Sequence, residues 1–136
     1  MADVTFTAAS VLPGTNAQLL DVNLGATITA GLFVYLDTAD NEYKIADCTT
    51  STTTANVAGI ASIGGADGQR GVIQTSGYVT ADNLTANTIY VLSVAGKLAP
   101  AADFLAATDY LTVLGCAVSA TSLKLGINVT GSGKTG

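Results

Sequence analysis

Apolar residues along the chain fall in short runs that alternate with polar positions and are separated by Gly, Thr, Asn or Asp. The clearest runs are FVYL at 33–36 and IYVL at 89–92, and turn-forming residues follow both. Val, Ile, Thr and Tyr favour strands, and strands separated by turns at intervals of roughly ten residues are typical of sandwiches and barrels. The pattern therefore predicts an all-β fold, a small β-barrel or sandwich.

One stretch, PAADFLAATD at 100–109, does not alternate in this way. Pro100 would suit the first turn of a helix, because that position needs no backbone N–H. We expect at most one short helix, of one or two turns, in this stretch.

The pattern also repeats within the chain. ITAGLFVYLDTA, from Ile28, is similar to LTANTIYVLSVA, from Leu84, at an offset of 56 residues (84 minus 28). Three more blocks follow in the same order: YKIAD (43–47) and GKLAP (96–100), VAGIAS (57–62) and VLGCAV (113–118), VIQTSG (72–77) and GINVTG (126–131). Gly59 and Gly115 interrupt the third blocks, and glycines inside strands usually mark bulges. The chain is predicted to contain two similar β modules.

Two such modules would close most simply into one pseudo-symmetric unit. We predict a single β domain at 25–131, with module one at 25–80 and module two at 81–131. Residues 1–24 hold one alternating stretch, VTFTA, and then a Pro-Gly turn signal. They are predicted to be an extended N-terminal arm, which either adds a strand to a partner's sheet or forms an edge strand of its own domain.

The composition narrows the possible functions. Apolar residues make up 49% of the 136 residues, enough for one core, while charged residues make up 11%, far below the usual quarter or so. The sequence has no histidine. This removes the commonest general base, the histidine-dependent nucleophiles and most zinc and iron sites. We therefore predict no catalytic residue, no metal site and no cofactor.

The net charge is −5, and the five basic residues are scattered singly along the chain. Without a basic stripe to neutralise phosphates, nucleic-acid binding is not expected. The apolar runs are far too short to span a membrane, and the N-terminus lacks the features of a secretion signal. These features predict a protein made in the cytoplasm, with no membrane or nucleic-acid partner.

Four acidic residues gather in LDTADNEYKIAD: Asp37, Asp40, Glu42 and Asp47. A calcium loop would need an oxygen ligand at the position of Ala39 and a glycine after it, and neither is present. Apolar residues flank the cluster on both sides, and Asp40-Asn41 suits a tight turn. The cluster is predicted to be the tip of a β-hairpin.

The chain ends in GSGKTG, which contains the Gly-Lys-Thr of a phosphate-binding loop. Such a loop needs a glycine where this sequence has Asn128, and a helix after the threonine, where only Gly136 follows. Residues 132–136 are therefore predicted to be a flexible tail and not a nucleotide site.

The cysteines and tyrosines do not point to a ligand site either. Cys48 and Cys116 lack any metal-ligand spacing and are predicted to be thiols, not a disulfide. Most of the tyrosines fall in apolar strand patterns, so we expect most of them in the core.

Four short motifs follow one another within residues 34–79. They are Leu36-Asp37-Thr38 before a charged turn, Lys44-Ile45-Ala46 before a Thr-rich connection, Ala58-Gly59-Ile60-Ala61, and Ser76-Gly77-Tyr78. With these motifs the stretch, about a third of the chain, resembles the lambda-type head decoration (capsid cement) proteins of tailed bacteriophages.

The resemblance implies a mostly β protein that binds the outside of an expanded icosahedral capsid and reinforces it against the pressure of packaged DNA. Its partner would be the major capsid protein, and it would be a non-enzymatic homo-oligomer, commonly a trimer, located on the virion. In that family the N-terminal segment orders against the capsid. Capsid contact is therefore a hypothesis for these residues of the arm: Val4, Thr5, Phe6, Thr7, Val11, Leu12 and Pro13. Because a second module follows here, the family's trimer contacts are not transferred to numbered residues.

Two other functions stay open at this point. A tail, fibre-base or host-attachment protein of the virion would suit the same composition but would be present in few copies. An enzyme or nucleotide binder is disfavoured by the missing histidines and the incomplete phosphate loop.

Overall fold

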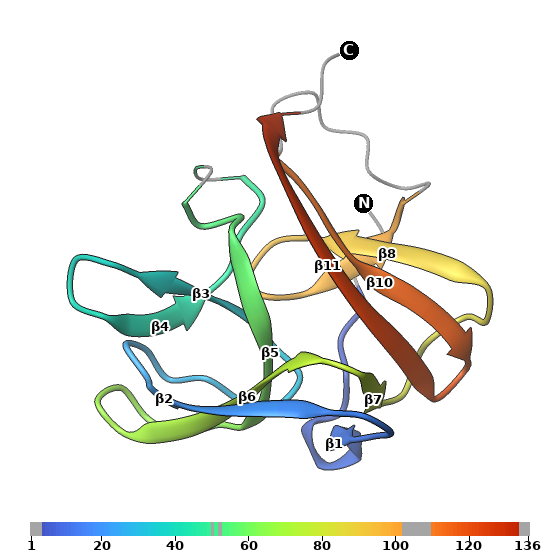
Figure 1. Cartoon of the computed structure of the whole chain (residues 1–136), viewed down its shortest axis with the longest axis horizontal. Coiled ribbons are helices and arrows are strands. Elements are labelled where there is room, and N and C mark those ends of the chain that lie inside the picture. Colours follow the sequence, from blue (N-terminus) through green and yellow to red (C-terminus); the bar gives the residue numbers. More distant parts are fainter. Residues whose placement is uncertain (1–3, 50, 52, 102–109, 134–136) are drawn as a thin grey trace.

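The computed structural model describes residues 4–49, 51, 53–101 and 110–133, and over these residues the chain is an antiparallel β sandwich (Figure 1). Two sheets share one core, and neither sheet closes into a barrel. The all-β prediction is confirmed, in its sandwich form.

The two sheets have the same strand order. The N-terminal sheet runs β2 (Gln18–Asn23), β6 (Arg70–Ser76), β5 (Val57–Ile63), β3 (Phe33–Asp37), β4 (Glu42–Ile45). The C-terminal sheet runs β1 (Leu12–Pro13), β7 (Tyr78–Thr80), β11 (Ser122–Gly133), β10 (Tyr110–Ser119), β8 (Thr88–Leu92), β9 (Leu98–Pro100). A short 3-10 helix, η1 (Ala8–Ser10), precedes β1. Without β1, the order β2-β6-β5-β3-β4 corresponds strand for strand to β7-β11-β10-β8-β9, which supports the internal repeat.

The repeat extends to single residues. Gly59 pairs with β3 beside a bulge in β5, and Gly115 pairs with β8 beside the corresponding bulge in β10. A Cβ at Gly59 would lie 2.5 Å from the carbonyl oxygen of Gln74, and a Cβ at Gly115 would run into the carbonyl oxygen of Lys124. Both positions need glycine because the backbone of the next strand approaches too closely for a side chain.

A second repeated feature is the turn that precedes β3 and β8. Gly31 and Asn87 have φ values of 97° and 61°, a left-handed conformation that Gly and Asn adopt more readily than other residues. Their N–H groups donate to the carbonyl oxygens of Ala61 and Ala117, at 2.9 and 2.7 Å. Donors and acceptors are each separated by the predicted offset of 56 (87 minus 31, 117 minus 61).

The second and fourth sequence blocks are aligned wrongly in the predicted repeat. By strand register, Tyr43 corresponds to residue 98 instead of 96, and Gln74 to residue 124 instead of 128. The second block shifts because the chain from Leu36 to its partner Tyr43 is one residue longer than the chain from Leu92 to its partner Leu98. The fourth block shifts because the loop between β5 and β6 is longer than the one between β10 and β11. Both errors are even numbers of residues, which preserve the alternation between the two faces of a strand.

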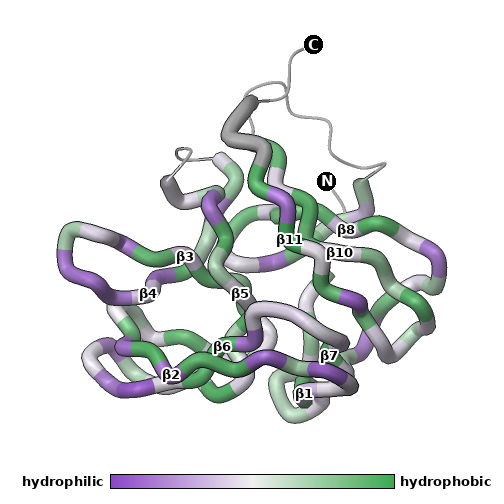
Figure 2. Tube along the Cα trace, viewed as in Figure 1, coloured by the Kyte–Doolittle hydropathy of each residue, from purple (hydrophilic) through white to green (hydrophobic). Residues whose placement is uncertain are grey.

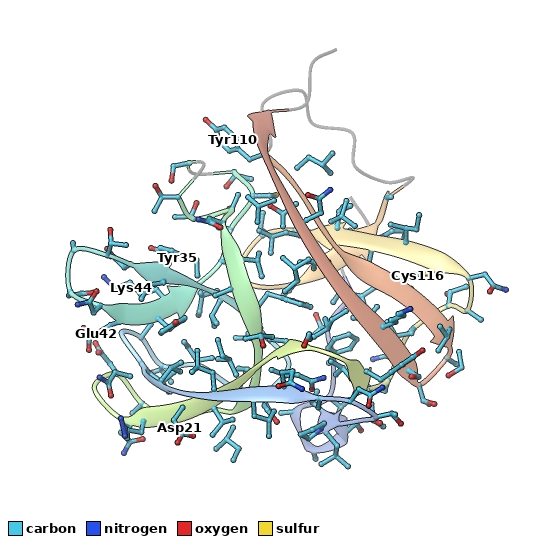
Figure 3. All side chains as sticks on the ribbon, in the orientation of Figure 1. Asp21, Tyr35, Glu42, Lys44, Tyr110 and Cys116 are labelled. Atoms are coloured by element: carbon cyan, nitrogen blue, oxygen red, sulfur yellow. The ribbon has the colours of Figure 1, made fainter. Side chains whose placement is uncertain are left out.

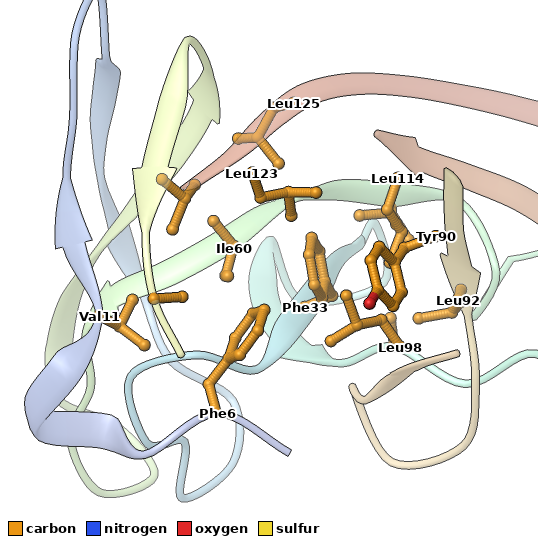
Figure 4. Packing of buried hydrophobic residues seen from close by; sticks show 14 of the residues in the cluster. Phe6, Val11, Phe33, Ile60, Tyr90, Leu92, Leu98, Leu114, Leu123 and Leu125 are labelled. Carbon is orange, nitrogen blue, oxygen red and sulfur yellow. The ribbon is translucent and has the colours of Figure 1, made fainter. Parts of the chain in front are cut away.

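The main hydrophobic core lies between the sheets (Figure 4). Phe33 and Ile60 enter it from the N-terminal sheet, while Tyr90, Leu114 and Leu123 enter it from the C-terminal sheet. A smaller apolar cluster lies on the other face of the N-terminal sheet. The middle of that sheet is therefore buried on both faces.

Of the two alternatives for residues 1–24, the described part of the segment follows the second and pairs within its own domain. Val4 donates its N–H to the carbonyl oxygen of Leu98 at 2.6 Å, and Phe6 and Val11 are buried in the main core. β1 then pairs with β7, and β2 pairs with β6. The apolar side chains of the segment cover one end of the core, so the segment forms edge strands of its own domain.

Other predicted boundaries differ as well. The boundary after residue 80 puts β7 in module one, whereas β7 pairs in the C-terminal sheet and the chain changes sheets at Gly77, where φ is 88°. The predicted helix at 100–109 lies outside the described residues except for Pro100, which ends β9, and Ala101. The predicted tail at 132–136 begins within β11, and its last three residues are outside the described part. None of the described helical residues forms a segment long and apolar enough to span a membrane.

One turn joins the two sheets through backbone hydrogen bonds. Gly96, between β8 and β9, donates its N–H to the carbonyl oxygen of Ala46 at 2.7 Å and accepts the N–H of Phe33 at 2.9 Å. Its φ of 75° suits glycine, and a Cβ there would lie 3.0 Å from the Phe33 carbonyl oxygen. These contacts fix the C-terminal sheet over the β3 side of the N-terminal sheet.

Gly59→Ala and Gly115→Ala should each destabilise the protein by about 2–4 kcal/mol, because the neighbouring backbone must move to admit a methyl group. Gly126→Ala is the matched control in β11, since a Cβ there meets nothing within 4 Å. It should change stability by no more than about 1 kcal/mol. Urea denaturation measures all three, and equal stability of Gly115→Ala and Gly126→Ala would contradict the proposed role of the bulges.

Candidate functional site

The acidic cluster forms the hairpin between β3 and β4, as predicted. Asn41 occupies the turn with φ of 58°. The Nζ of Lys44 pairs with carboxylate oxygens of Asp37 at 2.6 Å and Asp40 at 3.1 Å. Figure 3 shows Lys44 and Glu42 at this end of the molecule. A lysine of the hairpin itself thus pairs with two of its acidic side chains.

The charged side chains of this hairpin shift one another's pKa values. The hydrogen bonds from Lys44 hold the pKa of Asp37 and of Asp40 below the ordinary value of 3.8, and the two carboxylates raise the pKa of Lys44. Partial burial, followed by repulsion from Asp40, raises the pKa of Glu42. Asp47 lies apart and accepts the N–H groups of Thr49 and Ala95.

The described residues contain no group of three or more His, Cys, Asp or Glu side chains placed to hold a metal ion. Cys48 is buried and Cys116 half-buried, and both are thiols. The Gly-Lys-Thr sequence extends beyond the described residues, which end at Gly133.

The residues predicted from the sequence to contact a capsid differ in their exposure to solvent. Thr5, Thr7, Leu12 and Pro13 are exposed, and Val4 is half-buried. The assignment is wrong for the other two, Phe6 and Val11, because their side chains lie in the core and cannot reach a partner. Only Leu12 and Pro13 lie beside a hollow in the surface.

This hollow, the β1–β2 groove, has a volume of about 590 Å³ and is mainly apolar. One wall is formed by Leu12 and Pro13 of β1, and the floor and the opposite wall come from the N-terminal sheet. The residues of that sheet that matter most for its character are Leu19, Asp21, Ile63 and Val72.

The apolar side chains of the groove are unusually open to solvent. Leu12 is 57% exposed, Leu19 53% and Ile63 59%. Scattered exposed apolar residues are normal, but several that line one concave surface typically mark an interaction site. Asp21 is the one titratable side chain in the lining. The groove is therefore suited to binding and lacks the paired groups of acid–base catalysis.

The sequence analysis missed Leu19, Leu20 and Ile63. One signal was present: QLLDVN has two adjacent leucines, so one of them must point away from whichever face of the strand is buried. No signal marked Ile63, because its strand reads as a continuous apolar run.

Beside the groove, β2 forms an edge of the N-terminal sheet. Leu24, directly after β2, forms hydrogen bonds of 2.8 Å through both its N–H and its C=O to residues just before β6. Backbone groups alternate along an antiparallel strand, so every second residue back from Leu24 also faces β6. The N–H and C=O groups of Leu19 and Asp21 therefore point outward, where the described residues pair no further strand with them. Beyond them, the end of β2 meets β4, where Leu24 bridges Tyr43 and Gly25 donates its N–H to the Tyr43 carbonyl oxygen at 2.8 Å.

The β2 edge carries both apolar and acidic side chains. Figure 2 shows both hydrophobic and hydrophilic positions along β2, and Figure 3 shows the Asp21 side chain at the outer margin of the sheet. Of the six residues of β2, five are exposed, and Val22 is the buried one. A partner could therefore reach the backbone and the side chains of β2 together.

A second, shallower hollow lies on the C-terminal sheet. It has a volume of about 280 Å³ and is lined by Ile89, Val113, Cys116 and Leu125, among others. Ile89 is 52% exposed, close to the exposure of Ile63 in the β1–β2 groove. It therefore offers a matched position for comparison.

No protein-family model matches this sequence, and no curated protein is significantly similar to it.

Lys44→Met should raise the pKa of Asp37 and Asp40 toward 3.8, because their main hydrogen-bond donor is lost. A carboxyl with a lowered folded-state pKa stabilises the fold above its ordinary pKa, and this contribution disappears as the pH falls through the lowered value. The variant should therefore lose less stability than the wild type between about pH 4 and pH 2. NMR titration of the carboxyl carbons measures the pKa change, with Lys97→Met as the control. An unchanged Asp37 titration in Lys44→Met would contradict the ion pair.

Proposed function

We propose that the protein is a non-enzymatic structural protein of a phage virion, which binds the outer surface of the capsid and stabilises it. The observation that carries the proposal is the β1–β2 groove, an open apolar surface beside an uncovered strand edge. The resemblance of residues 34–79 to head decoration proteins suggests the capsid as the partner. The proposed contact surface keeps Leu12 from the contacts predicted in the arm and adds Leu19 and Ile63.

The groove supports a binding role because burial of its apolar side chains would be favourable at about 25 cal/mol per Å². A single groove of this size provides limited affinity. A capsid, however, repeats the same site many times, and a homo-oligomer that engages several sites gains avidity without new contacts. Attachment to adjacent subunits of the major capsid protein would stabilise the shell in the same way.

A tail or host-attachment protein is the alternative, and the tyrosines argue against it. Such a protein commonly presents aromatic side chains to its ligand. Here Tyr35 and Tyr90 are buried in the core, and Tyr43, Tyr78 and Tyr110 are half-buried. No tyrosine stands fully exposed.

The direct test is the copy number of the chain in purified particles of its source virus, measured by quantitative mass spectrometry against the major capsid protein. Hundreds of copies at a fixed ratio to the capsid protein are expected. A handful of copies would favour the tail, and absence from the particle would overturn the virion assignment.

Ile63→Asn should weaken binding to purified capsids at least tenfold, because it places an amide in the apolar floor of the groove. Ile89→Asn is the matched control: it makes the same change at a similar exposure on the other sheet and should leave capsid binding unchanged. Both variants should keep stability within about 0.5 kcal/mol, because both side chains are exposed. Co-sedimentation with capsids measures the binding, and equal binding by the two variants would remove the groove from the contact surface.

A further inference from the structure

We propose that β2 receives an extended strand from a partner polypeptide, which carries a basic side chain opposite Asp21 and an apolar side chain opposite Leu19. The inference rests on the proposed function for the identity of the partner, a capsid subunit, and specifies which segment of that partner binds. Backbone hydrogen bonds would supply affinity, and the two side chains would set the register.

The internal repeat indicates that a strand belongs beside β2. In the C-terminal sheet the strand equivalent to β2 is β7, and the chain covers its outer edge with β1, through the pairs Leu12–Thr80 and Pro13–Val79. In the N-terminal sheet the equivalent positions are Leu20 and Asp21, and among the described residues no strand pairs with their outer edge; β4 reaches only the end of β2, at Leu24. The outer edge of β7 is thus covered by a strand of the same chain, whereas in the described part of the chain the corresponding edge of β2 is not.

Apart from the charge of Asp21, the edge of β2 lacks the features that usually prevent pairing. Natural sheets protect exposed edges with Pro, Lys, bulges in the edge strand or very short strands. The strand is six residues long, contains neither Pro nor Lys, and has five exposed residues. Its outward N–H and C=O groups at Leu19 and Asp21 match an antiparallel strand.

The side chains of the edge determine the chemistry of the incoming strand. In antiparallel pairing, a residue directly opposite another lies on the same face of the sheet. The residue opposite Leu19 would therefore enter the β1–β2 groove, where Leu12 offers an apolar wall. Asp21 forms no ion pair within the described part of the chain, so a Lys or Arg opposite it would supply the missing partner.

A second copy of this chain does not fit the same site. β2 itself contains no basic residue, and self-pairing would bring two acidic strands together in a protein of net charge −5. Like charges on paired strands are destabilising. The charge of the edge therefore favours a different polypeptide.

The inference can be tested without the capsid by a synthetic probe, acetyl-Thr-Thr-Lys-Thr-Leu-Thr-amide, titrated to millimolar concentration into the isotope-labelled protein. In the antiparallel register its Lys lies opposite Asp21 and its Leu opposite Leu19. NMR should show chemical-shift changes along β2 and hydrogen exchange at least tenfold slower for the amides of Leu19 and Asp21. Replacing the Lys of the probe by Glu should weaken binding at least tenfold.

The decisive variant is Leu19→Pro, with Leu19→Ala as its control, so that both variants lose the same apolar side chain. Proline at this position removes an outward N–H that makes no bond to β6, a place where edge strands tolerate proline. Asp21 is unchanged in both variants, but the ring blocks the incoming strand. The probe should bind Leu19→Pro at least tenfold more weakly than Leu19→Ala.

Equal binding of the probe by these two variants, or absence of shifts at β2, would overturn strand addition even if capsids bind the wild type. Probe binding at β2 without any capsid binding would instead overturn the proposed function and keep the strand acceptor. If the free protein is an oligomer in which the Leu19 and Asp21 amides are already protected, a second copy occupies the edge and the inference is wrong. Analytical ultracentrifugation and hydrogen exchange of the free protein distinguish that case.

Discussion

Two backbone hydrogen bonds at Gly96 hold one sheet of the sandwich against the other. They connect the β8–β9 turn to Ala46 and Phe33, so the C-terminal sheet covers the β3 side of the N-terminal sheet. The far end of that sheet, where β5 ends at Ile63, is left to the short β1 segment. An apolar groove results there because one two-residue strand cannot cover the space that a full sheet would fill. The candidate binding surface is therefore a consequence of how the sheets are joined.

Much of the fold could be predicted from sequence, because strand alternation and turn residues act locally. The repeat was also detectable, since Gly59 and Gly115 mark the same close approach of strands in both halves. The register of the hairpins was not, because a shift by two or four residues leaves the alternation of faces unchanged. Loop length sets the register, and a pattern of apolar positions does not encode it.

Only part of the proposed binding surface could be predicted from the sequence. Leu12 and Pro13 were named, but Leu19 and Ile63 come from other strands and meet them only in the folded chain. The same limitation explains the error at Phe6 and Val11. Their alternating pattern is that of a strand, and only the tertiary structure decides whether such a strand packs on its own core or on a partner. Burial in the core decided it here.

The geometry of β2 also has a mechanical consequence. Hydrogen bonds between antiparallel strands are perpendicular to the strand direction, so a pull along β2 loads all of its bonds to β6 at once. A pull that peeled β2 away from one end would break those bonds one after another. A protein anchored through a strand paired with β2, as proposed, would therefore resist sliding over its partner more strongly than lifting from it.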